Sequence, residues 1–419
     1  AYMGGLALGA AVAARFAHSI RRPVLVYGVL ELGIALCALG VPYGMRAIEA
    51  LTVAVLGGGE TAGDPGAWAG LFRLVTAFVL LLPPTALMGA TLPLLTRHVV
   101  RRDEEVGPRI GALYATNTAG AIGGTLCAAF LLLPTLGLRQ TVYLGAAVNG
   151  LVFVAAALVA RGARPPVASP TTPDEEPTHI GRWVLPLMTL SGAISFAYEV
   201  LWTRLLSQIL GGSVYAFSTM LASFLVGITL GSAIAGRLSR TRERATVGFA
   251  WAQVGTAALT LGAFAAANQL PAIAKQLGAG GLAGLGANAA LSGLVLLPFA
   301  TCIGATFPFA VRIVTVGAEA SSEATARVYA WNTVGSILGA IGAGFFLLPW
   351  LGFLGLISLG CALNLTIAVI ASRAGEAKPL APLVAAAVGA VLLVFGPIGE
   401  PWNLLRATPM TGGSAPGEI

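Results

Sequence analysis

A carboxylate and an indole lie three residues apart in one apolar segment of the sequence, which reads Tyr198-Glu-Val-Leu-Trp202. If this segment is a helix, Glu199 and Trp202 share one of its faces. Such a pair suits an organic cation, because the carboxylate attracts the positive charge and the indole adds a cation–π contact. A structural role is the alternative, with Glu199 either paired to Arg204 or hydrogen-bonded to another helix.

Other polar side chains inside apolar segments extend the set of candidate binding residues. Glu31 is the other acid well inside such a segment, where an ionisable group is costly and is by default a functional candidate. Two asparagines share helix faces with tyrosines, and they either line a path through the molecule or clamp its halves together. The candidate substrate-binding residues are Glu199, Trp202, Glu31, Tyr114, Asn117, Tyr329, Asn332 and Gln253. The sequence contains no nucleophile–base pair, metal-ligand cluster or phosphate loop, so we predict neither a catalytic nor a metal site.

The composition identifies the class of protein that must position these residues. Of the 419 residues, 57% are hydrophobic and 10% are charged. Soluble domains have about 25% charged residues, and disordered chains have low hydrophobicity, so both classes are excluded. The apolar stretches are roughly 20 residues long, enough to cross a lipid bilayer as helices. We therefore predict an all-α polytopic membrane protein, with apolar segments at 1–17, 23–44, 66–96, 110–134, 138–160, 184–210, 213–236, 245–268, 286–311, 326–349, 352–372 and 379–397.

The positive charges predict the orientation. Most of the 24 lysines and arginines fall on one side when successive loops are placed alternately. Cytoplasmic loops carry such an excess, so this side, with the proline-rich linker 161–182, is predicted to be cytoplasmic in a multi-pass protein of the cell (inner) membrane. The net charge of +7 then needs no nucleic acid to explain it.

The two halves of the sequence repeat. Gly5-Leu-Ala-Leu-Gly9 matches Gly227-Ile-Thr-Leu-Gly231, and Tyr114-Ala-Thr-Asn-Thr-Ala-Gly120 matches Tyr329-Ala-Trp-Asn-Thr-Val-Gly335. Matching segments enter the membrane from the same side, as in the two halves of major facilitator transporters. We expect two parallel six-helix repeats and one extra C-terminal helix. We expect the first helix of repeat 1 to be missing, because nothing in the first half matches 184–210 and the chain begins inside an apolar run.

This repeat divides the chain into four parts. They are an N-terminal membrane repeat at 1–160 with five spans, the linker at 161–182, a C-terminal membrane repeat at 183–374, and the extra helix with its tail at 375–419. Paired glycines are expected to let helix backbones approach closely, and Pro93 and Pro308 are expected to kink their helices.

The motifs resemble those of a known family. Tyr198-Glu-Val-Leu-Trp-Thr-Arg204, the two Gly-Ala-Thr-x-Pro segments and the two Tyr-x-x-Asn-Thr-x-Gly segments followed by Leu-Leu-Pro are similar to the membrane region of bacterial fused transporter–spermidine synthase proteins. The resemblance implies a soluble domain after the last helix that transfers an aminopropyl group from decarboxylated S-adenosylmethionine to putrescine. The family's glycine-rich cofactor loop and catalytic aspartate have no match here, so residues 1–419 are expected to bind no cofactor and to have no aminopropyltransferase activity.

The resemblance and the candidate residues lead to one expected function and two alternatives. We expect the membrane domain of a polyamine synthase fusion, which binds or transports polyamines or their precursors. The alternatives are a membrane anchor or regulator of the synthase domain that transports nothing, and an unrelated secondary transporter of organic cations. The predicted orientation conflicts with this function. Two six-helix repeats and the extra helix make thirteen spans, which would place a synthase domain after the last helix outside the cytoplasm, unless 379–397 does not cross the membrane.

Overall fold

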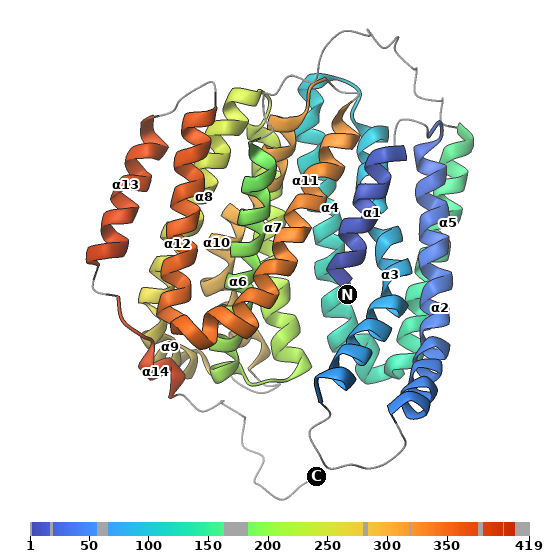
Figure 1. Cartoon of the computed structure of the whole chain (residues 1–419), viewed down its shortest axis with the longest axis horizontal. Helices are drawn as coiled ribbons and strands as arrows, with labels where there is room; N and C mark the ends of the chain where they lie inside the picture. Colours follow the sequence, from blue (N-terminus) through green and yellow to red (C-terminus); the bar gives the residue numbers. More distant parts are fainter. Residues whose placement is uncertain are drawn as a thin grey trace, which may run out of the picture. The chain divides into compact units, whose positions relative to one another are not determined.

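The computed structural model describes residues 2–16, 20–56, 66–162, 183–279, 284–317, 320–375, 380–396 and 398–406. All regular elements within these ranges are helices (Figure 1). Most of the predicted linker 161–182, and the tail after residue 406, lie outside the described residues.

The longer helices are α1 (Tyr2–Phe16), α2 (Pro23–Leu56), α3 (Gly66–Val99), α4 (Val106–Cys127), α5 (Leu133–Gly162), α6 (Val184–Leu210), α7 (Val214–Leu238), α8 (Arg242–Ala265), α10 (Leu285–Val314), α11 (Ser321–Ile341), α12 (Leu348–Ala374) and α13 (Leu380–Phe395). The short elements are η2 (Asp103–Glu105), η4 (Ala267–Gln269), α9 (Leu270–Leu277) and α14 (Trp402–Leu405). Two π-helical turns, Ala128–Leu132 and Gly342–Leu347, follow α4 and α11.

The described helices confirm an all-α polytopic membrane protein. Within the described ranges, eight helical runs are long and apolar enough to cross a membrane. Two of them, Asp103–Arg161 and Ser321–Ala374, are interrupted by glycines with non-helical backbone, Gly137 (φ 72°) and Gly352 (φ 67°). When these two runs are divided at their glycines, the eight runs become ten. The shorter apolar helices α1 and α13 bring the number within the described ranges to twelve, which is the number of predicted segments.

The helix α2 is longer than the sequence indicated. The predicted segment ends at residue 44, but the helix continues to Leu56 and includes Arg46 and Glu49. Both side chains are exposed, so the helix carries them without burying a charge.

Contacts divide the chain into two compact units. The first comprises α1, α2, α3, the part of α5 after its first turn, and α11 up to Val334. The second comprises α4, α6 to α10, the rest of α11, and α12 to α14. In the second unit α4 packs closely on α7, because Gly111 of α4 lies against Gly236 of α7 with no room for a Cβ on Gly111. The helix α4 therefore groups with helices from the second half of the sequence.

Within each unit, one helix pair shows the glycine packing that the repeat predicts. A Cβ added at Gly9 of α1 would overlap the backbone of Ala86 in α3, and one added at Gly231 of α7 would overlap the backbone of Thr301 in α10. Further glycines in close contact at matching positions are Gly5 and Gly89 in the first pair, and Gly227 and Gly304 in the second. This correspondence supports the repeat alignment, whereas a parallel relation between complete halves stays a prediction.

The helix breaks also recur at matching positions. Each π-helical turn is followed by a Pro-x-x-Gly segment, Pro134 to Gly137 and Pro349 to Gly352, and both glycines have positive φ. Glycine adopts this conformation without the Cβ clash that other residues meet, so each motif turns the chain between two helices. In contrast, α3 and α10 continue through Pro93 and Pro308.

The extra helix α13 runs beside α12 along its length (Figure 1). It begins near the end of α12, and the chain after it reaches the beginning of α12, where the Leu354 backbone N–H donates to Glu400 Oε1 (3.2 Å). Residue 400 and Arg373 therefore lie at opposite ends of the second unit, as expected if α13 crosses the membrane.

Candidate functional site

Glu199 is the candidate whose carboxylate lacks a partner among the described residues. It lies in the middle of α6, where its side chain is half-buried, and it forms no hydrogen bond or ion pair with any described residue. Arg204, the internal partner considered above, donates instead to the carbonyl oxygen of Gly344 (3.3 Å). A carboxylate in an apolar helix without a counter-cation is able to accept a cationic ligand.

Trp202 is enclosed by aromatic side chains of other helices. Its side chain is 0% exposed. Its ring stacks on Phe299 (centroids 6.2 Å apart, planes at 24°) and meets Phe264 edge-on (6.4 Å, 76°). Aromatic rings gain most of their stabilisation from such burial, and a ring enclosed in this way has no open face for a cation. The indole N–H has no hydrogen-bond partner among the described residues.

Gln253 and Tyr198 take part in buried hydrogen bonds that join helices of the second unit. Gln253 is 1% exposed, and its Nε2 donates to Ser191 Oγ (3.0 Å), linking α8 to α6. The Tyr198 hydroxyl accepts from Asn364 Nδ2 (3.1 Å) and donates to Cys361 Sγ (3.5 Å), linking α6 to α12. These bonds satisfy polar groups that lipid could not, which gives Gln253 a structural role in the described helices.

The α4 candidates differ in accessibility. Tyr114 is half-buried, and its ring stacks on Phe307 of α10 (4.5 Å, 25°). Asn117, three residues later, is exposed and makes no hydrogen bond with the described residues. Of this pair, Asn117 has the side chain that is free to contact a ligand.

The remaining candidates lie in the first unit. Glu31 is half-buried in α2, and Tyr27, one turn earlier, hydrogen-bonds to it. Tyr329 and Asn332 are half-buried in α11, and both have interactions with other groups. The candidates are thus divided between the two units: Glu199, Trp202, Gln253, Tyr114 and Asn117 lie in the second, and Glu31, Tyr329 and Asn332 in the first.

One ion pair of the second unit was not predicted from the sequence. Arg312, at the end of α10, donates to both carboxylate oxygens of Asp103 (Nη1–Oδ1 3.0 Å, Nη2–Oδ2 2.6 Å). The Arg312 side chain is 8% exposed and the Asp103 side chain 50%. Bidentate pairs of this kind are strong and directional, so this one fixes the start of α4 against α10. No pattern in the sequence indicates that Arg312 and Asp103 form a pair.

The described residues contain no group of three His, Cys, Asp or Glu side chains that could hold a metal ion. Neither a protein-family model nor a curated protein matches the chain. The resemblance to fused transporter–spermidine synthase proteins therefore stays a prediction based on motifs.

Proposed function

We propose that this chain is the membrane domain of a polyamine synthase fusion and that it binds polyamines or their precursors through the carboxylate of Glu199. The order of motifs supports the family, and the unpaired carboxylate of α6 supports the ligand class. In this proposal the chain lies in the inner membrane with its linker in the cytoplasm. Its further partners are a C-terminal synthase domain and, for that domain, decarboxylated S-adenosylmethionine.

The observation that carries the proposal is the absence of a counter-cation for Glu199 among the described residues. An isolated carboxylate in an apolar helix is expensive to maintain, and such residues usually mark a ligand or ion path. A protonated amine would supply both the missing charge and hydrogen-bond donors. Because Trp202 is enclosed, recognition rests on this charged contact and not on a cation–π contact.

A membrane anchor that binds no polyamine is the second candidate, and the second unit contains an observation in its favour. Trp202 of α6, three residues after Glu199, packs with Phe264 and Phe299 in a closed aromatic core. An anchor needs only such packing. The third candidate, a transporter of unrelated organic cations, shares the Glu199 contact and differs only in the ligand preferred.

Equilibrium binding of radiolabelled spermidine to the purified chain distinguishes the three candidates. The proposal predicts saturable binding of the radiolabelled spermidine. Unlabelled spermidine and putrescine should displace it, whereas a monovalent quaternary amine should displace it poorly. Preferential displacement by the quaternary amine would favour an unrelated cation transporter. Absence of saturable binding by a well-folded chain would favour the anchor.

A further inference from the structure

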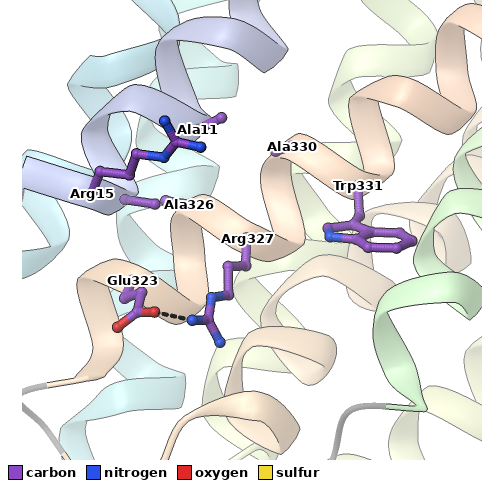
Figure 2. Close-up of a pocket in the computed structure, with 8 residues that line it drawn as sticks. Ala11, Arg15, Glu323, Ala326, Arg327, Ala330 and Trp331 are labelled. Carbon is purple, nitrogen blue, oxygen red and sulfur yellow. Dashed lines mark ion pairs between the residues drawn. The ribbon is translucent and has the colours of Figure 1, made fainter.

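A groove of about 310 Å³ lies in the first unit between the last turn of α1 and the first half of α11 (Figure 2). From α11 it is lined by Glu323, Arg327 and Trp331, which are spaced four residues apart and therefore lie on one helix face. Arg15 enters it from α1, and alanines of both helices complete the lining. The groove is a separate feature from the Glu199 site of the second unit.

Of the two arginines that line the groove, Arg15 is the one whose guanidinium is available to a ligand. Arg327 forms an ion pair with Glu323, one turn earlier in α11 (Figure 2). Arg15 is exposed and forms no ion pair or hydrogen bond with any described residue. Two arginines and one glutamate give the lining one net positive charge, so the groove is suited to an anion. Guanidinium groups bind phosphate oxygens in a two-pronged geometry.

The rest of the lining indicates an anion with an apolar part. The Trp331 side chain is 45% exposed, and tryptophan is enriched where a membrane meets water. Arg15 and Arg327 both belong to the arginine-rich side predicted from the sequence. Basic pockets between membrane helices on that side bind lipid head groups. We propose that this groove binds the phosphate of an anionic phospholipid, with Arg15 as its main contact and Trp331 beside the glycerol region of the lipid.

The equivalent helix pair of the repeat is in close backbone contact at two glycines. The start of α4 and the end of α7 correspond to the start of α11 and the end of α1. In that pair Gly107 lies against Ser239, and Gly111 lies against Gly236, with no room for a Cβ. In α11 the matching positions are Ser322 and Ala326, which bear side chains. The groove is therefore a difference between otherwise similar helix pairs.

The proposal can be tested by titrating phosphatidylglycerol into the full chain in detergent and measuring lipid binding by native mass spectrometry. We expect Arg15→Gln to weaken the first bound lipid about five-fold, since one arginine near a membrane surface contributes on the order of 1 kcal/mol. We expect Glu323→Gln to strengthen binding several-fold, because it removes the negative charge that neutralises Arg327. Phosphatidylcholine, which has no net charge, should bind weakly to all variants.

Arg373→Gln is the matched control, because Arg373 is also an exposed arginine in the last turn of a helix but does not line the groove. Wild-type melting temperatures in the variants would show that they are folded. Equal loss of binding in Arg15→Gln and Arg373→Gln would overturn the proposal, since it would indicate general attraction between charges. Unchanged binding in Arg15→Gln would also overturn it. A second titration, with inorganic phosphate, distinguishes a lipid phosphate from free phosphate as the bound anion. If the chain binds inorganic phosphate in an Arg15-dependent way but binds no lipid, a lipid is excluded.

Discussion

Removal of the Asp103 carboxylate should destabilise the second unit by leaving Arg312 without its partner. Arg312 is almost fully buried, whereas half of the Asp103 side chain is exposed. Breaking a fully buried pair costs about 3–5 kcal/mol, and a hydrogen bond to a charged group contributes about 1.5–3 kcal/mol. Because water can reach Asp103 and solvate the guanidinium in the variant, we expect Asp103→Ala to cost about 1.5–3 kcal/mol, below the range for a fully buried pair.

A double-mutant cycle isolates the pairwise part of this effect. Asp103→Ala, Arg312→Met and the double variant are unfolded in mixed micelles with increasing dodecyl sulfate, and tryptophan fluorescence reports the transition. The double variant should be more stable than the sum of the single effects predicts, with a coupling energy of about 1–2 kcal/mol. The Arg109–Glu105 pair (3.6 Å), in which the arginine is exposed, is the control, and it should couple by less than about 0.5 kcal/mol. Similar small couplings for both pairs would refute the argument that the Arg312–Asp103 pair fixes α4 against α10.

Two further predictions concern packing. Gly231→Leu should destabilise the chain by about 1–3 kcal/mol, because the new side chain would meet the Thr301 backbone. Gly120→Ala should be tolerated, because Gly120 has open space around it. Equal melting temperatures in the two variants would contradict the close contact of α7 with α10. Trp202→Leu should cost about 2–4 kcal/mol through lost aromatic packing while leaving polyamine affinity unchanged, and a fall in affinity with unchanged stability would instead indicate that the indole contacts the ligand.

The sequence predicts the helices more accurately than it predicts their neighbours. The apolar segment 184–210 has the same bounds as α6, and Gly9 and Gly231 lie in close backbone contacts as their spacing suggested. These features depend on local composition and on residues three or four apart. The apolar segment 23–44 is shorter than α2, because apolar composition stops before Arg46 and Glu49 whereas the helix continues through these exposed charges.

The position of a side chain among other helices is harder to predict. The spacing of Glu199 and Trp202 predicts that they share a face of α6, but it carries no information on the residues of α8 and α10 that enclose the Trp202 ring. The Arg312–Asp103 pair joins residues separated by 209 positions, and helical periodicity carries no information over that distance. The sequence therefore predicts candidate polar residues, whereas tertiary contacts separate those that are satisfied internally, such as Gln253, from those that are not, such as Glu199.

The affinity and the melting temperature of Glu199→Gln, measured on the same preparation, test the proposed cation site most directly. The variant keeps the shape of the side chain and removes its charge. A charge-assisted contact contributes roughly 1.5–3 kcal/mol, so spermidine affinity should fall about 10- to 150-fold at 1.4 kcal/mol per decade, with little change in melting temperature. Glu49→Gln, which removes an exposed carboxylate of α2, should bind spermidine as the unmodified chain does. Unchanged spermidine affinity in a well-folded Glu199→Gln chain would contradict the assignment of Glu199 to the binding site.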